Sequence, residues 1–162
     1  MASTWQNEIV IILRHLINDL GSPPTYDDSR LEETILVAAQ LLIYEVDFNK
    51  EYTIDVDSGT LSPNPVAEAK DNAFVNLCAL KATCIILGSE YKTNTTRSVM
   101  VQDGPSKIDY TGVVDQSKTI WEESIKRYAH ARVQYQAGNS IAGKAILSPF
   151  TSELTDVIRG NF

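Results

Sequence analysis

The sequence predicts a mainly α-helical protein: a four-helix, bundle-like protomer with a short β-hairpin (about 52–62), a long loop or hairpin (about 89–113) and a C-terminal arm. Two observations predict this class. Apolar residues recur at helical spacing in four segments, and one short segment alternates between apolar and polar residues around a turn. The 162 residues suit one domain. We expect it to be a helical domain over 1–138, with both insertions, followed by the arm over 139–162.

The first two helices are expected from about Thr4 to Leu20, where Gly21 ends the first, and from Asp27 or Asp28 to about Val46. A stiff connector with two prolines, residues 22–25, separates them. The second helix has few polar residues between positions 34 and 44. We therefore expect it to be covered on most sides, by its own domain or by neighbouring subunits.

The hairpin is predicted from the alternating residues 52–56, a turn at Asp57-Ser58-Gly59 and a returning strand at 60–62. Pro65 fits the start of a third helix, over 66–88. That helix has two apolar lines, which make it the best candidate for the central core helix: Val66, Ala69, Ala73, Leu77, Leu80, Cys84 and Leu87 in the first, and Phe74, Cys78 and Ile85 in the second.

Residues 89–113 are polar and rich in turn-forming residues, so we expect a long loop or loose hairpin that serves as a contact arm. A fourth helix follows at about 115–137, and Gly138 ends it. One of its stripes carries Trp121, Ile125, Tyr128, Arg132 and Tyr135. The arm after it contains Ser148-Pro149, a helix start signal that predicts one short helix over 150–158. This arm is too weakly amphipathic to form a core of its own.

Charge and composition exclude several classes. The chain has 14 Lys plus Arg against 21 Asp plus Glu, a net charge of −7, of which −6 lies in residues 1–48. Duplex-DNA readers carry a basic face, so tight nucleic-acid binding is disfavoured. The longest uninterrupted apolar runs are a few residues long, below the roughly 20 of a spanning helix, so no membrane contact is expected. The first residues lack a secretory signal pattern, so we expect the protein to stay inside the cell that makes it.

Candidate metal and nucleophile sites are weak. Asp55 and Asp57 flank a turn as in calcium loops, but Gly59 comes one place early and loop position twelve is Val66. A solvated hairpin explains them better. Cys78 and Cys84 lie on different faces of one helix, so we expect buried free thiols and no disulfide. With only His15 and His130 besides, no zinc site is expected, and both histidines are interpreted as surface residues.

No enzymatic site emerges. The sequence contains no nucleophile elbow, phosphate-binding loop or dinucleotide fingerprint. Adjacent glutamates, such as Glu32-Glu33 and Glu122-Glu123, point about 100° apart on a helix and cannot converge on one substrate atom. The aromatic stripe of the fourth helix could stack bases, but core or subunit packing explains it better. We therefore expect no catalytic, cofactor-binding or metal-binding residues, and a protein that is not an enzyme.

Three stretches together resemble the neck proteins of tailed bacteriophages, the head-to-tail connector, adaptor and head-completion family. The first is residues 20–31, with Tyr26 and Asp28 leading into a second helix. The second is the hairpin and proline segment 58–65, followed by Asp71, Phe74 and the core helix to residue 84. The third is the loop sequence 101–109. The motifs are short and driven by packing, and the C-terminal arm matches no part of the family.

The resemblance implies a connector protomer, a structural virion protein that forms a ring of typically twelve copies beneath the portal and extends the DNA channel toward the tail. Its partners would be further copies of itself, the portal protein and tail or other neck proteins, with DNA passing through without sequence-specific binding. The protein would be made in the host cytoplasm and located at the head–tail interface of the virion. Two alternatives remain: a tail-terminator or tail-completion ring protein, and a small helical regulator that binds a partner protein.

Overall fold

A computed structural model describes residues 4–67, 69–98 and 111–139. Four helices and a two-stranded antiparallel sheet follow one another in the order α1 (Trp5–Ile17), α2 (Asp28–Glu45), β1 (Thr53–Asp55), β2 (Thr60–Ser62), α3 (Asn72–Ser98) and α4 (Thr111–Asn139). The predicted class, mainly α with a short hairpin, is confirmed. Of the predicted arm 139–162, only Asn139 belongs to the described residues, as the last residue of α4.

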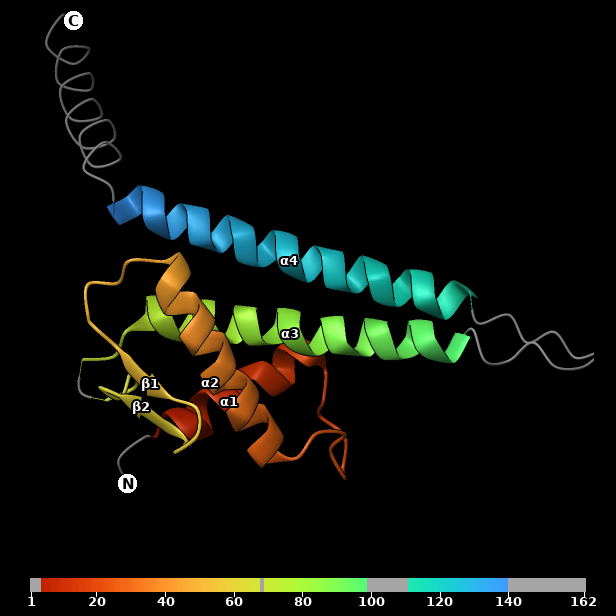
Figure 1. Cartoon of the computed structure of the whole chain (residues 1–162), viewed down its shortest axis with the longest axis horizontal. Coiled ribbons are helices and arrows are strands. Elements are labelled where there is room, and N and C mark those ends of the chain that lie inside the picture. The colour runs from red at the N-terminus through yellow and green to blue at the C-terminus, as the bar shows by residue number, and fades with distance from the viewer. Residues whose placement is uncertain (1–3, 68, 99–110, 140–162) are drawn as a thin grey trace, which may run out of the picture.

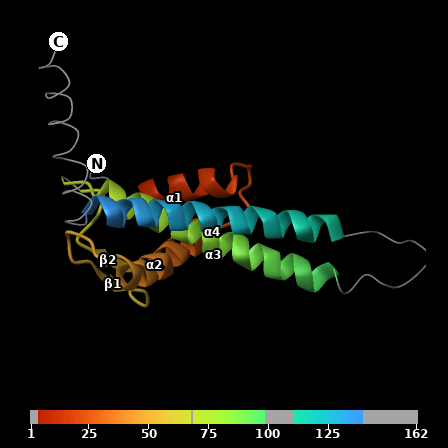
Figure 2. The ribbon, with the colours of Figure 1, turned by 90° about the horizontal axis from the view of Figure 1, so that it is seen from above.

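Helix α3 is the centre of the fold. It packs along its length against the antiparallel α4, and against α1 and α2 near its N-terminal half (Figure 1). Seen from above, α1 and α2 emerge on opposite sides of the α3–α4 pair (Figure 2). The prediction of a central core helix is therefore confirmed, and contacts on three sides explain why both predicted apolar lines of this helix are needed.

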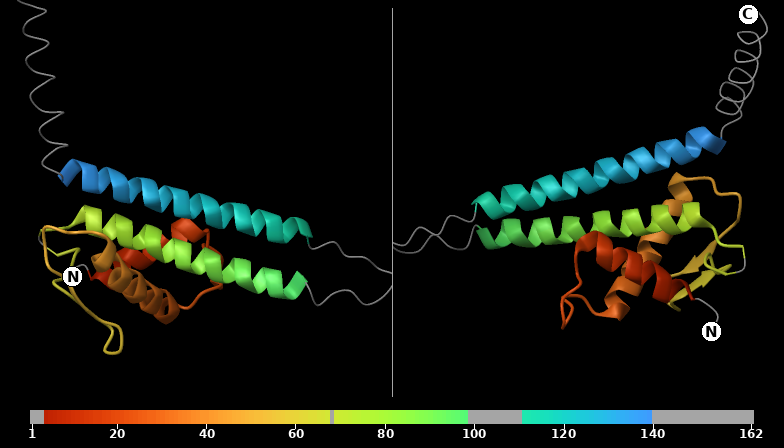
Figure 3. Two further views of the ribbon diagram at one scale, coloured as in Figure 1. Left: turned by 45° about the horizontal axis from the view of Figure 1, so that its top comes forward. Right: turned by 180° about the vertical axis from the view of Figure 1, so that it is seen from behind.

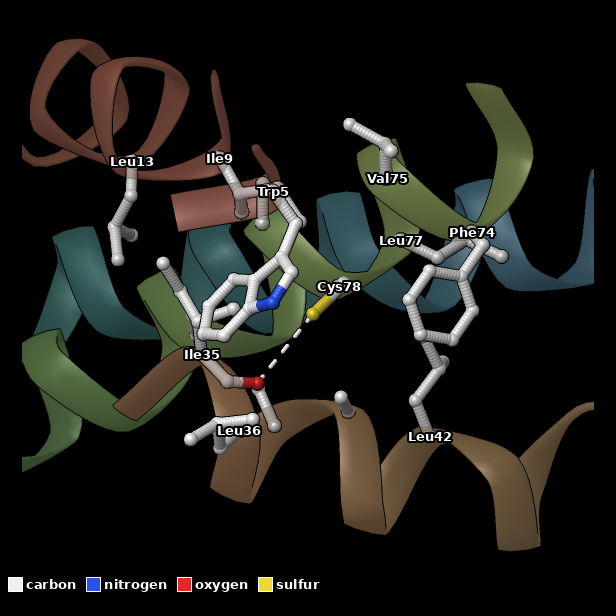
Figure 4. Packing of buried hydrophobic residues seen from close by; sticks show 14 of the residues in the cluster. Trp5, Ile9, Leu13, Ile35, Leu36, Leu42, Phe74, Val75, Leu77 and Cys78 are labelled. Atoms are coloured by element: carbon white, nitrogen blue, oxygen red, sulfur yellow. Dashed lines mark hydrogen bonds between the residues drawn. The ribbon is translucent and has the colours of Figure 1, made fainter. Parts of the chain in front are cut away.

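The core joins the inner faces of α1, α2 and α3 (Figure 4). The largest of its fully buried side chains come from all three helices: Ile9, Leu13, Leu31, Ile35, Leu42, Phe74, Val75 and Cys78. The Cys78 thiol donates to the carbonyl oxygen of Ile35 at 3.5 Å, which ties α3 to α2. Both cysteines are free, as predicted, although only Cys78 is fully buried.

Helix α1 ends three residues earlier than predicted. Its apolar residues Trp5, Ile9 and Leu13 face the core, but Leu20 is 57% exposed and lies beyond the helix. Asn18 ends the helix in the left-handed conformation, with φ of 59°, which asparagine tolerates better than most residues. Helix α2 begins after Asp27, as predicted, but that side chain makes no capping hydrogen bond.

The hairpin prediction is confirmed. Ile54 of β1 pairs with Leu61 of β2, and Leu61 is the buried residue of its strand. Gly59 has a positive φ of 69° in the turn, which favours glycine. Phe48, Tyr52, Phe74 and Tyr135 form a cluster of aromatic rings that fastens this part of the chain to α3 and α4.

The predicted start of the third helix is wrong: α3 begins at Asn72, not at residue 66. The segment before it forms a turn in which the Asp71 amide donates to the Pro65 carbonyl at 2.8 Å. The Asp71 carboxylate then accepts from the Phe74 amide at 3.0 Å, the bond of an N-cap residue. Val66 is still buried, so its contribution to the core was predicted correctly although its conformation was not.

The prediction of a loop over 89–113 is wrong at both ends of that range, which are helical. Residues 89–98 continue α3 and residues 111–113 begin α4. The rest of the predicted loop, residues 99–110, lies outside the described residues. The polar residues that suggested a loop bond to the helices' own backbone: the hydroxyls of Thr93 and Thr96 donate to the carbonyls four residues earlier, at 3.0 Å each. The outer halves of α3 and α4 thus form a two-helix stem that extends past α1 and α2 (Figure 3).

Residues Asn72–Thr96 of α3 are long and apolar enough to cross a membrane by length and composition alone. Half of that window is buried inside the fold, and core helices of soluble proteins meet the same criterion. The absence of a membrane contact remains a prediction.

Candidate functional site

The Asp-rich hairpin is a turn. The Asp55 carboxylate accepts from the backbone amides of Asp57 at 3.0 Å and Ser58 at 3.1 Å. Hydrogen bonding from the Ser58 side chain first, and then from these two amides, holds the pKa of Asp55 below its usual value. Asp57 points into solvent beside it. Within the described residues, no group of three or more His, Cys, Asp or Glu could hold a metal ion.

The histidines lie on the surface, as predicted: His15 and His130 are both exposed. The aromatic stripe of α4 is used for packing, which was the preferred interpretation. Tyr128 is buried, Trp121 stacks on Tyr91 of α3 with ring centroids 5.5 Å apart, and Tyr135 lies 5.4 Å from Phe48.

Arg14 and Asp19 form an ion pair that holds the segment connecting α1 and α2 in place. The Arg14 guanidinium binds the Asp19 carboxylate at 2.5 Å and the Asp28 carboxylate at 2.6 Å, and donates to the Tyr26 carbonyl at 2.8 Å. Asp19 also accepts from the amides of Thr25 and Tyr26. Burial alone would raise the pKa of Asp19, but these amides and the Arg14 charge outweigh it and lower the pKa.

Tyr26 links this connecting segment to α3. Its hydroxyl donates to the Glu90 carboxylate at 2.5 Å, and the guanidinium of Arg30 lies 5.0 Å from its ring centroid. Burial, together with the Glu90 bond, raises the pKa of Tyr26 far above its usual value. Tyr26 and Asp28, two residues of the first neck-protein-like stretch, therefore have structural roles in this chain.

An open groove of about 490 Å³ runs between α2, α3 and α4. Its walls are mostly apolar and include Leu41, Cys84, Ile85, Trp121, Ile125 and Tyr128. Leu41 is 44% exposed and Ile125 39% exposed, so the apolar lining continues to the surface. We call this feature the α2–α4 groove.

One wall of the groove carries an ionic cluster. The Glu45 carboxylate, at the end of α2, accepts from Lys81 at 2.5 Å, Tyr128 at 2.6 Å and Arg132 at 3.2 Å. Burial would raise the pKa of Glu45, but the bonds from Lys81, Tyr128 and Arg132 outweigh it and lower the pKa. The Arg132 Nε atom is buried and has no hydrogen-bond partner within the described chain.

Sequence reasoning missed this cluster. The sequence predicts Arg132 on the apolar stripe of α4, and a cation among Trp121, Ile125 and Tyr128 indicates a buried partner. Glu45 was that partner, 87 positions away in the chain, so the spacing of residues within one helix could not identify it.

The outer face of α2 leaves large apolar side chains exposed. Val37, Leu41 and Tyr44 follow one another at spacings of four and three, and their exposed fractions are 39%, 44% and 80%. We call these three residues the α2 stripe. Among the described residues, the chain covers the inner face of α2 and leaves the α2 stripe exposed. The expected cover by neighbouring subunits stays a prediction.

The stem formed by the outer halves of α3 and α4 is closely paired. A Cβ atom added to Gly88 would lie 2.9 Å from the Trp121 ring nitrogen, so glycine permits this approach. Beyond Tyr91 and Trp121, the Asn94 amide donates to the Ser117 hydroxyl at 2.9 Å. The two helices of the stem are therefore held together by side-chain contacts.

No protein-family model, no curated protein and no solved structure matches the chain at a significant level. Its function is therefore inferred from the motif residues and from the surfaces of the fold.

Proposed function

We propose that this chain is a structural component of a bacteriophage neck, a ring-forming adaptor that joins the portal to the tail and continues the DNA channel. The proposal includes the partners that the family resemblance implies: further copies of the chain in a twelve-membered ring, the portal protein, and tail or other neck proteins. It assigns the protein no catalytic residue and no cofactor.

The observation that carries the proposal is the α2 stripe. These three large apolar side chains are neighbours on one exposed helix face, and contiguous exposed apolar surface can mark a protein–protein interaction site. Tyr44 in particular is 80% exposed and next to the C-terminal end of α2. In a ring, this face would be covered by the adjacent subunit, the second of the two coverings expected from the sequence.

Two further features support it. The α3–α4 stem extends away from α1 and α2 (Figure 3), which suits an arm that reaches a neighbouring ring. The chain carries a net charge of −7, and a surface of like charge disfavours capture of passing DNA.

Mass measurement tests the assembly. Twelve copies of the 17.9 kDa chain have a mass of about 215 kDa, and we expect this species alone or after mixing with portal protein. Tyr44→Glu should prevent assembly while leaving the helical circular dichroism unchanged. The matched control is Val56→Glu, which places the same charge on an exposed apolar residue of the hairpin turn, 40% exposed. A chain that stays monomeric and never joins portal or tail particles contradicts the proposal.

Micrographs of phage particles that carry a label on this chain would distinguish the alternatives. A label between head and tail supports the neck assignment. A label at the end of the tail tube beyond the neck supports a tail-terminator protein, and a label absent from particles supports a partner-binding regulator.

A further inference from the structure

We propose that the α2–α4 groove is the docking site for the C-terminal segment of the same chain, residues 140–162. This inference concerns the isolated protein and does not depend on the phage-neck proposal. Three observations support it. The described chain ends near the groove, the remaining residues are long enough to reach back to it, and the apolar surface of the groove, without cover among the described residues, matches the apolar face predicted for the segment.

The described chain ends beside the groove. Helix α4 lines it from Trp121 to Arg132 and finishes at Asn139, two turns later. Near that end, the Gln136 side chain donates to the Glu45 carbonyl at 3.1 Å, so the last turns of α4 lie against the end of α2. The chain therefore leaves the described fold two turns beyond the last α4 residue that lines the groove.

The remaining residues are long enough to return. The groove-lining part of α4, from Trp121 to Arg132, is about 17 Å long, and Ile125 lies about 21 Å back from Asn139 along the helix. The ten residues 140–149 span up to about 33 Å when extended, which covers that distance. The helix predicted over 150–158 would be about 14 Å long, close to the length of the groove.

The chemistry of the two surfaces is complementary. Phe150, Leu154 and Val157 recur at spacings of four and three, so a helix would place them on one face. That segment has too few apolar residues to build a core alone. The groove presents an apolar wall, with Leu41 and Ile125 partly exposed, that needs cover. Because the segment is tethered beside the groove, its effective concentration there is of millimolar order, which favours docking within one chain over an untethered partner.

Cys84 provides a direct measurement, because it lines the groove whereas Cys78 is fully buried. The rate of alkylation of Cys84 by iodoacetamide should rise about tenfold in full-length Leu154→Asp, which weakens docking and opens the groove. Ser152→Asp is the matched control: it adds the same charge to the same segment, off the apolar face, and should react like the wild type. Equal rates in all three proteins would overturn the proposal.

A second experiment determines whether the docked segment comes from the same chain or from another copy. Full-length Phe150→Cys, Leu154→Cys and Val157→Cys are oxidised in dilute solution and separated without reductant. We expect at least one to form a disulfide with Cys84 inside a single chain, seen as a monomer of changed mobility and mapped by mass spectrometry. Disulfides found only between chains, or no disulfide to Cys84 in any of the three, would overturn docking within the chain.

Discussion

Glu45→Gln tests whether the ionic cluster in the groove holds α2, α3 and α4 together. In the native protein one carboxylate accepts from Lys81 on α3 and from Tyr128 and Arg132 on α4. Glutamine keeps the size of the side chain but removes its charge and one of its acceptor oxygens. Lys81 and Arg132 then remain close together, each with a positive charge and a weaker partner.

The expected loss of stability in Glu45→Gln follows from how exposed the side chains of the cluster are. The side chains of Lys81 and Glu45 are 17% and 29% exposed, and that of Arg132 is 36% exposed. Exposed ion pairs contribute about 0–1 kcal/mol, whereas breaking a fully buried pair costs about 3–5 kcal/mol. This cluster lies between those limits, and glutamine retains some hydrogen bonding. We expect a loss of about 1–2 kcal/mol, equivalent to a fall in Tm of about 3–6 °C.

The loss should depend on pH. The pKa of Glu45 is lowered from an ordinary value of 4.5 in the folded protein, so on acidification the unfolded state binds the proton first. The stabilisation by this carboxylate is therefore complete above about pH 4.5 and declines as the pH falls through the folded value. Because the glutamine variant cannot titrate there, its stability should approach that of the wild type below pH 4.5.

Urea unfolding followed by circular dichroism measures both effects, with Glu122→Gln as the control. Glu122 pairs with Lys118 at 3.8 Å, and both side chains are about half exposed, so that change should cost no more than about 0.5 kcal/mol. Equal losses for Glu45→Gln and Glu122→Gln at pH 7, or a difference from the wild type that does not narrow in acid, would refute the role of the cluster.

Three further changes test other parts of the fold. Asp19→Asn should cost about 2 kcal/mol, since it leaves the largely buried Arg14 without its closest carboxylate, and it should flatten the decline of stability below pH 3.8 in urea titrations. Phe74→Ala should cost about 3–5 kcal/mol by opening a cavity between α2 and α3, and a loss below about 1 kcal/mol by thermal unfolding would contradict the packing. Gly88→Val should displace Trp121, shift its fluorescence and cost about 1–3 kcal/mol; unchanged fluorescence would contradict the close approach.

The number and order of the elements could be predicted because each depends on local spacing. Trp5, Ile9 and Leu13 repeat within one helix, and Asp57-Ser58-Gly59 marks a turn without help from the rest of the chain. The described helices and strands appear in the predicted order. Periodicity of this kind is a property of neighbouring residues, so a single sequence displays it.

The predictions were wrong at positions where contacts between distant residues, or a competing cap, determine the secondary structure. Residues 89–98 look like a loop because Thr and Asn favour turns, yet the stacking of Tyr91 on Trp121 and the bond from Asn94 to Ser117 keep them helical against α4. Pro65 resembles a helix start, but Asp71 supplies the cap and so sets the boundary six residues later. In both places a residue distant in the sequence, or a competing cap, outweighs the local pattern.

The candidate site could be predicted only in part. Exposure of the α2 stripe depends on the fact that α1 and α3 cover the other face of α2, which periodicity alone does not fix. The sequence showed an unusually apolar helix, and the structure shows which three of its residues lack cover: Val37, Leu41 and Tyr44. The groove depends on three helices at once, and its ionic cluster joins positions 45, 81 and 132.

Ion pairs within the fold neutralise part of the negative charge of residues 1–48. Eight acidic residues lie in the first 48, but four of them bind cations of the fold: Glu8 pairs with Lys70, Asp19 and Asp28 with Arg14, and Glu45 with Lys81 and Arg132. The other four make no ion pair within the described residues and lie at the two ends of α2: Asp27, Glu32, Glu33 and Asp47. Repulsion of DNA by this part of the chain would therefore come from the ends of α2. In the proposed ring, neutralising Glu33 and Asp47 together should strengthen DNA retention by the assembled particle, whereas neutralising Glu45 should instead weaken the fold.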